Sequence, residues 1–240
     1  MAQERSLPPS ERSVTEAPQK PASLAAAENA EPPGSLWARM KADPQYAPEH
    51  LALEAVRRLG PEAAEWVRLT RADNPEITPD ELADLAVKRF TTLARISGAV
   101  SGATGLPGAV LDVGVLAWNQ ARMVLHVAAA YDHDPSASER ATDLLVLQRV
   151  HKAAQSARVA LGVAAGRERA VRLLGGAASG PLSGAMVRLG VKLAGMAGVR
   201  AAKKVFAKMI PGAAVVLGTW ANAAATKNLA GRTRELYRPA

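Results

Sequence analysis

The stretch ISGAVSGATGLPGAVL runs from Ile96 to Leu111 and contains no charged residue. Glycine recurs through it, and a proline follows the third glycine; these positions are Gly98, Gly102, Gly105, Pro107 and Gly108. The run is too rich in glycine for an ordinary amphipathic helix, and the Pro-Gly pair interrupts a plain membrane span. Glycines four residues apart let helix backbones approach closely. We therefore predict a tightly packed bend between two helices.

Both sides of this run carry helix signals. Thr78-Pro79-Asp80-Glu81 predicts a helix start, because Thr78 and Glu81 have the spacing of a capping box and Pro79 suits the first turn. The helix that follows has apolar residues three and four apart and enters the glycine run. Pro107 favours a second start, and residues 110–131 are expected to form one long helix that ends before Asp132.

The rest of the chain is also predicted to be helical. Ser136 and Glu139 have capping-box spacing and predict a helix to about residue 163. The other expected helices are short ones at 36–42, 49–59 and 61–71 and a basic one at 184–209. The predicted fold class is all-α, a multi-helix bundle with Gly-rich helix-helix junctions and a disordered N-terminal tail.

Composition indicates one domain and a tail. Of 240 residues, 48% are hydrophobic but only 4% are aromatic, so the core must be built from small aliphatic side chains. Residues 1–34 lack helical periodicity and are expected to be disordered, whereas residues 35–240 form a single helical domain. Within that domain the part at 35–165 is acidic to neutral and the part at 166–240 is basic. Cysteine is absent, which excludes disulfides and zinc-thiolate sites.

Positive charge is concentrated near the C-terminus. Residues 151–240 contain fifteen basic and two acidic side chains, although the net charge of the whole chain is only +8. Such segregation is typical of proteins that face a polyanion. The predicted helix at 184–209 places its basic residues opposite an apolar stripe. The residues expected to bind an anionic surface are Arg188, Lys192, Arg200, Lys203, Lys204 and Lys208.

The long helix carries a polar stripe. Asp112, Asn119 and His126 recur every seven residues, with Arg122 beside them. If both faces of the helix were packed, these residues would line an internal polar groove, and burial would shift the pKa of Asp112 or His126. The favoured interpretation is instead the solvated face of an amphipathic helix.

Known catalytic and metal-binding motifs are missing from the sequence. No nucleophile elbow, phosphate loop or metalloprotease motif occurs, so we predict no catalytic residue, no cofactor and no metal. The acidic turn Asp132-His133-Asp134 offers oxygen and nitrogen ligands to a metal, but adjacent residues seldom converge on one ion. We interpret it as a helix-ending turn in which Asp134 caps the next helix.

Two uncharged runs, at 96–111 and 209–226, raise the question of a membrane span. The second run has eighteen residues, the lower edge for crossing a bilayer, and it consists mostly of small residues with Asn222 among them. Packing or shallow contact is therefore expected rather than a span. The N-terminus lacks an apolar signal region, and the expected location is cytoplasmic, peripheral at the inner face of the cell membrane.

The residues around the glycine run resemble the EcsC family of bacterial proteins. The resemblance rests on the segment from Ala83 to Val150, which contains ISGAVSGATGLPGAVLDVGVLAWNQARMVLHVAAAYDHDPSASERATDLL, and on the closing segment KMIPGAAVVLGTWANAAATKNLAGRTRELY. It covers roughly residues 50–238. This chain departs from the family pattern at Asp132, where glycine is usual, and at Val113-Gly114, where a proline is usual. The resemblance implies an all-helical, membrane-proximal protein associated with an ABC exporter, with no catalytic residue to carry over.

Three functions follow as hypotheses. The first is a non-enzymatic protein that binds an anionic membrane surface, or a membrane protein complex such as an ABC transporter as an accessory factor. The second is a soluble helical adaptor or homo-oligomer that meets an acidic partner. The third is an enzyme built on the polar groove. Nucleic acid is an improbable partner, because the basic region offers only Phe206, Trp220 and Tyr237 for stacking.

Overall fold

The computed structural model describes residues 32–100, 105–174, 192–193, 195–196 and 213–239. The chain divides into two units, residues 1–30 and 31–240, and every described residue belongs to the second. The tail predicted at 1–34 therefore lies outside the described residues, except for its last three positions. The predicted basic helix at 184–209 is described only at four positions, all of them helical.

The described residues form helices and no strand, which confirms the all-α class. The elements are α2 (Gly34–Ala42), the 3₁₀ turn η1 (Pro44–Tyr46), α3 (Ala47–Asp73), α4 (Pro79–Val100), α5 (Gly105–Ala130), α6 (Glu139–Leu147), α7 (Ala154–Leu174) and α10 (Ala213–Tyr237). None of the helices searched in the described part is both long and apolar enough to cross a bilayer.

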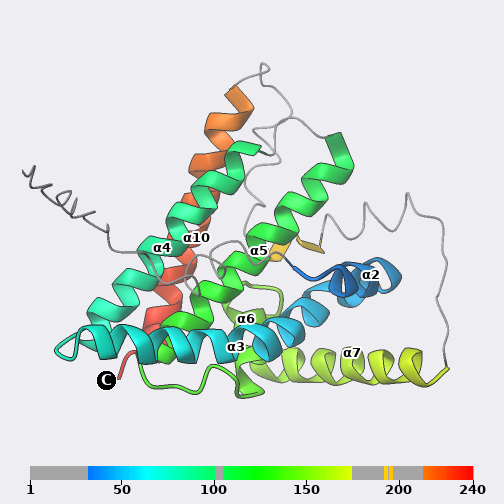
Figure 1. The fold of residues 1–240 in the computed structure, drawn as a ribbon. Coiled ribbons are helices and arrows are strands. Elements are labelled where there is room, and N and C mark those ends of the chain that lie inside the picture. Colours follow the sequence, from blue (N-terminus) through cyan, green and yellow to red (C-terminus); the bar gives the residue numbers. More distant parts are fainter. Residues whose placement is uncertain (1–31, 101–104, 175–191, 194, 197–212, 240) are drawn as a thin grey trace, which may run out of the picture. The chain divides into compact units, whose positions relative to one another are not determined.

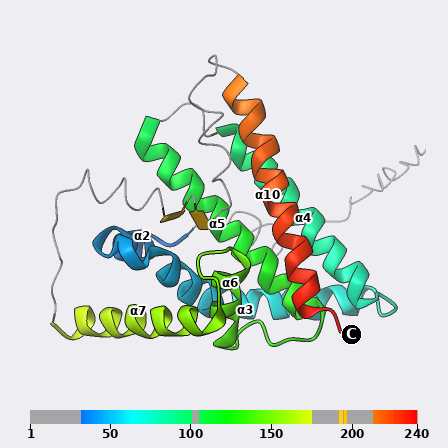
Figure 2. The same ribbon diagram turned by 180° about the vertical axis from the view of Figure 1, so that it is seen from behind.

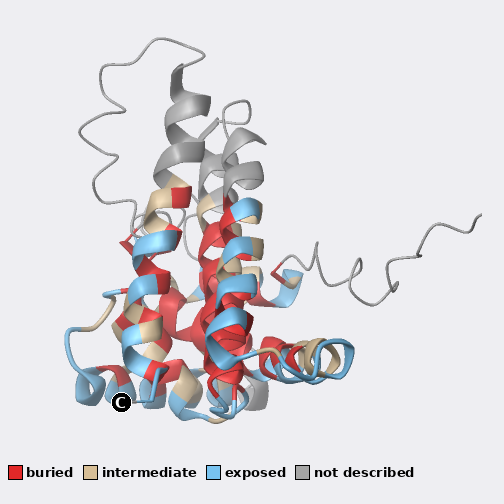
Figure 3. Ribbon diagram, turned by 90° about the vertical axis from the view of Figure 1, so that its left-hand side faces the viewer, coloured by how far each residue is buried: buried red, intermediate tan, exposed pale blue. Residues whose placement is uncertain are grey.

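Helix α5 is the centre of the packing. It packs against α3, α4 and α10, and α4 and α10 also run side by side (Figures 1 and 2). Helix α7 packs on α3 and α6. From Leu116 to Tyr131 every residue of the chain except Asn119 is buried (Figure 3). A helix that is covered on all sides in this way forms the inside of a bundle rather than its surface.

The start of α4 is as predicted. The Thr78 N–H donates to Glu81 Oε2 at 2.9 Å, and the Glu81 N–H donates to Thr78 Oγ1 at 3.3 Å. These two bonds satisfy backbone donors that the first helical turn leaves without partners. The Thr78 hydroxyl also donates to Glu81 Oε2, at 2.8 Å, and the bonds from the Thr78 N–H and hydroxyl lower the pKa of Glu81.

The glycine run contains the end of one helix and the start of the next. Helix α4 ends at Val100 and α5 begins at Gly105, and the two helices pack together. Gly98 lies in the last turn of α4, while Gly105 and Gly108 lie in the first turn of α5. Gly102 falls outside the described residues. The predicted helix-to-helix junction is thus confirmed by the two helices that flank it.

The prediction of separate helices at 49–59 and 61–71 is wrong, because α3 continues through Gly60-Pro61. Gly60 serves packing rather than chain reversal. A Cβ added at Gly60 would come within 2.8 Å of the Pro135 carbonyl oxygen and of Ser136 Cα. Only glycine lets the chain after α5 approach α3 this closely.

The predicted helix from Ser136 to about residue 163 is also wrong. Helix α6 starts at Glu139 after Ser138, no capping box forms, and the Ser136 N–H donates to Asp134 Oδ1 instead. Asp134 therefore closes a turn and does not cap α6.

Helix α6 ends at Leu147 because Arg149 takes a left-handed conformation with φ 57°. The Val150 N–H then bonds to the Leu145 carbonyl at 2.9 Å, and the Arg149 N–H bonds to the Val146 carbonyl at 2.9 Å. This pair of bonds is a Schellman motif, usually built on glycine, and the arginine gives no sequence signal for it.

Helix α5 ends in the same way at Asp132, whose φ is 64°. The His133 N–H bonds to the Ala128 carbonyl at 3.0 Å, and the Asp132 N–H bonds to the Ala129 carbonyl at 3.1 Å. The left-handed conformation explains why glycine suits this position, and the Asp132 carboxylate contacts Arg71 Nη1 at 2.7 Å.

Candidate functional site

The polar stripe predicted on the long helix is largely internal. Arg122 and His126 are fully buried and Asn119 is half-buried, while the side chain of Asp112 lies outside the described residues. The interpretation as a solvated face is therefore wrong for Arg122 and His126. It failed because α5 is covered by three other helices, which periodicity within α5 alone does not reveal.

His126 is held as a neutral imidazole. Its Nδ1 lies 2.8 Å from the carbonyl oxygen of Arg122, one turn earlier, so Nδ1 carries the proton and donates it. The ring lies between Trp66 and Phe90, with ring centroids 5.1 and 4.8 Å away. Nε2 meets no hydrogen-bond partner in the part of the chain that is described. Burial, helped by the positive charges of Arg89 and Arg122, lowers the pKa of His126 to about 3.

Arg122 joins three helices. Its Nη2 donates to Oε1 of Glu62 on α3 at 2.5 Å, and its guanidinium lies 5.5 Å from the Phe90 ring on α4. Arg89, also on α4, lies at the same distance from that ring. We call Glu62, Arg89, Phe90, Arg122 and His126 the buried cluster. Because Arg122 and His126 are fully covered, a solute reaches them only when the helices separate.

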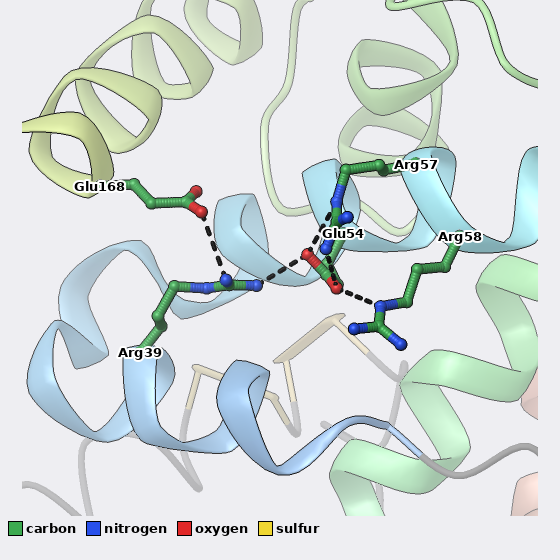
Figure 4. Close-up of polar contacts among 5 residues, drawn as sticks. All are labelled: Arg39, Glu54, Arg57, Arg58 and Glu168. Atoms are coloured by element: carbon green, nitrogen blue, oxygen red, sulfur yellow. Dashed lines mark hydrogen bonds and ion pairs between the residues drawn. The ribbon is translucent and has the colours of Figure 1, made fainter. Parts of the chain in front are cut away.

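A second charged cluster surrounds Glu54, a buried carboxylate of α3 (Figure 4). Arg39 Nη2 lies at 2.8 Å, and Arg57 Nη2 and Arg58 Nε each lie at 2.5 Å from a Glu54 oxygen. Burial by itself raises the pKa of Glu54, but the three arginines outweigh it and the pKa falls below its ordinary value. Arg39 also contacts Glu168 of α7 at 3.2 Å. The cluster fastens α2 and α7 to α3.

Sequence reasoning missed this second cluster. The spacing from Glu54 to Arg57 and Arg58 was available as a signal, since residues three and four apart face each other on a helix. No sequence pattern pointed to Arg39 or Glu168, which come from other helices.

A cavity of about 600 Å³ opens between the start of α3 and α7. Its lining comprises Gln45, Tyr46, Glu49, His151, Ala153, Gln155, Ser156, Val159, Ala160, Val163 and Lys192. Glu49 is 4% exposed, and His151 Nε2 lies 2.8 Å from its Oε1. Its Oε2 is buried and meets no hydrogen-bond donor among the described residues. We call this the α3–α7 cavity.

The predicted anionic-surface residues are mostly outside the described part. Lys192 is described, is exposed, and lines the α3–α7 cavity. The others, which the structure does not describe, are Arg188, Arg200, Lys203, Lys204 and Lys208.

The turn at Asp132-His133-Asp134 directs its side chains to different partners. Asp132 pairs with Arg71, His133 Nε2 lies 3.2 Å from the Tyr237 carbonyl oxygen, and Asp134 accepts from a backbone N–H of its own turn. The three side chains therefore do not converge on a common point.

Several basic residues of the last third belong to the fold. Their partners come from earlier elements: Arg167 pairs with Asp43, Arg234 with Asp84 and Arg238 with Asp80, and Arg232 donates to the Leu147 carbonyl at the end of α6. Asp80 also accepts from the Tyr131 hydroxyl at 2.5 Å. These hydrogen bonds, from Tyr131 first and Arg238 second, lower the pKa of Asp80.

The covered central helix, α5, follows the glycine-rich junction, and the basic final helix, α10, packs against α4 and α6. These features define a class of all-helical protein. The chain matches the model of the EcsC protein family over residues 77–239 and belongs to that family. No curated protein and no solved structure matches it. The match starts later than the resemblance expected from about residue 50, and it leaves α2 and all of α3 outside.

Proposed function

We propose that this protein is a non-enzymatic helical protein that binds an anionic membrane surface from the cytoplasmic side. At that surface it would act as an accessory factor of a membrane protein complex such as an ABC transporter. The proposal is carried by one observation, the composition of the outward face of α7. Charge distribution supports it further.

Helix α7 is amphipathic in an unusual way. It buries Ala157, Leu161 and Ala164 against the rest of the protein. Its outward side leaves Val159 65% exposed and Val163 39% exposed, one helical turn apart, so the two side chains form a small apolar surface. Exposed Arg158 and Arg169 lie on the same helix. Apolar side chains flanked by cations are typical of helices that lie in a membrane interface.

Exposed cations accompany this face in the last third of the chain. The described basic residues there that are exposed and have no ion pair among the described residues are Lys152, Arg158, Arg169, Lys192 and Lys227. Each basic residue near an anionic leaflet contributes on the order of 1 kcal/mol, so a few suffice for reversible binding. The predicted helix at 184–209 would add more.

Co-sedimentation with vesicles tests the proposal. We expect the full chain to bind vesicles that contain phosphatidylglycerol, to ignore vesicles of phosphatidylcholine alone, and to be released by salt. The double variant Arg158→Glu/Arg169→Glu should bind at least about tenfold more weakly, because two attractive charges become repulsive. The triple variant Lys203→Glu/Lys204→Glu/Lys208→Glu should do the same if the predicted basic helix takes part.

The control changes net charge equally at other sites. Lys41→Glu/Lys88→Glu replaces two exposed lysines of α2 and α4 and should retain most of the binding. Equal losses in this control and in the α7 variant would show that only net charge matters, and the α7 face would be discarded. Absence of binding to anionic vesicles at low salt would overturn the proposal and favour a soluble helical adaptor.

A further inference from the structure

We infer that the α3–α7 cavity binds the head group of a phospholipid that carries a primary ammonium, as phosphatidylethanolamine does. The inference rests on the proposed function for its source of ligand, the membrane. It adds a specific site and head group to what was proposed above as a general attraction to anionic lipid.

Glu49, one of the residues that line the cavity, lacks a hydrogen-bond donor at Oε2 in the described part of the chain. Glu49 is almost completely buried, and His151 satisfies only one of its two oxygens. A buried acceptor without a partner loses its hydrogen bonds to water and gains none in return, and the cost is greater when the acceptor is charged. A ligand ammonium that donates to Oε2 would remove this cost and pair the carboxylate with a positive charge.

The walls and rim suit the remainder of a phospholipid. Val159, Ala160 and Val163 provide an apolar wall, and the two valines are among the few large hydrophobic side chains left exposed in the described chain. Lys192 supplies a cation for a phosphate. The Glu49 carboxylate thus offers a contact for the ammonium and Lys192 one for the phosphate. The apolar wall offers contacts for the glycerol and its acyl chains.

A primary ammonium fits better than a quaternary one. Quaternary ammonium groups carry no N–H and depend on open aromatic faces. Tyr46 is the aromatic residue of the cavity lining, and the Arg167 guanidinium already lies 4.9 Å from its ring centroid. A choline head group would also leave Glu49 Oε2 without a donor.

Calorimetric titration of the full chain with dihexanoyl lipids, below the concentration at which they form micelles, tests the inference. We expect the phosphatidylethanolamine form to bind about tenfold more tightly than the phosphatidylcholine form, because one charge-assisted hydrogen bond distinguishes them. Glu49→Gln should abolish the difference. Water-soluble phosphoethanolamine should bind more weakly than the lipid, because it lacks the apolar part.

Val159→Asp keeps the test informative if Glu49→Gln unfolds the protein, since Val159 is exposed. It should weaken binding of both lipids, while Leu85→Asp, a change at an exposed leucine of α4 outside the lining, should leave both unchanged. Equal affinity for the two lipids would overturn the inference, even if anionic vesicles bind. Discrimination between the lipids without vesicle binding would instead retain the site and reject the proposed function.

Discussion

Gly114 makes room for the indole ring of Trp37. A Cβ added at Gly114 would lie 2.0 Å from Trp37 Cη2, closer than any two carbon atoms approach without a bond. The two residues come from α5 and α2, so this contact attaches the first described helix to the central one. It also gives a physical role to a position where the family pattern is not followed.

Gly114→Ala should therefore lower the free energy of unfolding by about 1 kcal/mol. Overpacking costs about 1–3 kcal/mol, and the better helix propensity of alanine recovers about 1 kcal/mol. Urea unfolding followed by circular dichroism measures the difference. The control is Gly231→Ala in α10, where nothing lies within 4 Å, and it should stabilise the protein. A stabilised Gly114→Ala variant would show that the indole moves without cost.

At the scale of elements, two helices end in the same motif without glycine. Asp132 and Arg149 both have positive φ and close Schellman motifs after α5 and α6. For a residue with a side chain the left-handed conformation costs about 1–2 kcal/mol. Asp132 recovers part of this cost through its ion pair with Arg71.

Arg149→Gly should raise the free energy of unfolding by about 1 kcal/mol, because glycine adopts the required φ without strain. Arg149 is exposed, and its positive charge lowers the pKa of nearby Arg232 after the larger effect of burial, so its loss should also relieve a repulsion. Thermal unfolding should show a rise in Tm of about 2–4 °C. Arg149→Ala is the matched control: it removes the same charge but keeps the strain. An equal gain in both variants would assign the effect to charge.

At the scale of the whole molecule, acid stability should depend on the buried cluster. The pKa of His126 is about 3 in the folded protein and near 6.5 in the unfolded chain. Between these values the unfolded chain binds more protons, so stability falls as the pH falls below about 6.5. The loss between pH 7 and pH 5 should be about 2 kcal/mol.

His126→Asn places an amide donor near the Nδ1 position but does not titrate. Whatever its effect on absolute stability, its free energy of unfolding should decline less between pH 7 and pH 5 than that of the parent protein. His133→Asn, at an exposed histidine, is the control. An unchanged pH slope in the His126 variant would mean that the imidazole is reached by water in the native state.

At the scale of the whole molecule, part of the positive charge of the last third is neutralised by ion pairs within the protein. Arg234 of α10 and Arg238, directly after that helix, pair with Asp84 and Asp80 of α4, so part of the C-terminal excess of positive charge neutralises the acidic first part of the domain. The basic residues of the last third of the chain therefore have two roles. Some of them hold helices together through ion pairs, and the exposed ones on α7 are the basis of the proposed membrane-binding surface.

Some features of the fold could be predicted from residues that lie close together in the sequence. The capping box at Thr78 and Glu81 involves residues three apart, and the all-α class follows from helical periodicity and the composition of the core. The junction in the glycine run is likewise marked by residues close together in the sequence, glycines and a proline. Such features can be predicted without knowledge of the rest of the chain, because the interacting groups are neighbours in the sequence.

Only the tertiary structure decided the features that depend on distant residues. Gly60 lies inside α3 and lets residues 135–136 pack against that helix, and α6 ends at Leu147 although Arg149 gives no stop signal. The sequence by itself determined that the chain is helical, where α4 begins and where positive charge collects. Whether Arg122 and His126 face water or the core was decided by three helices covering α5, since burial depends on what packs against a face.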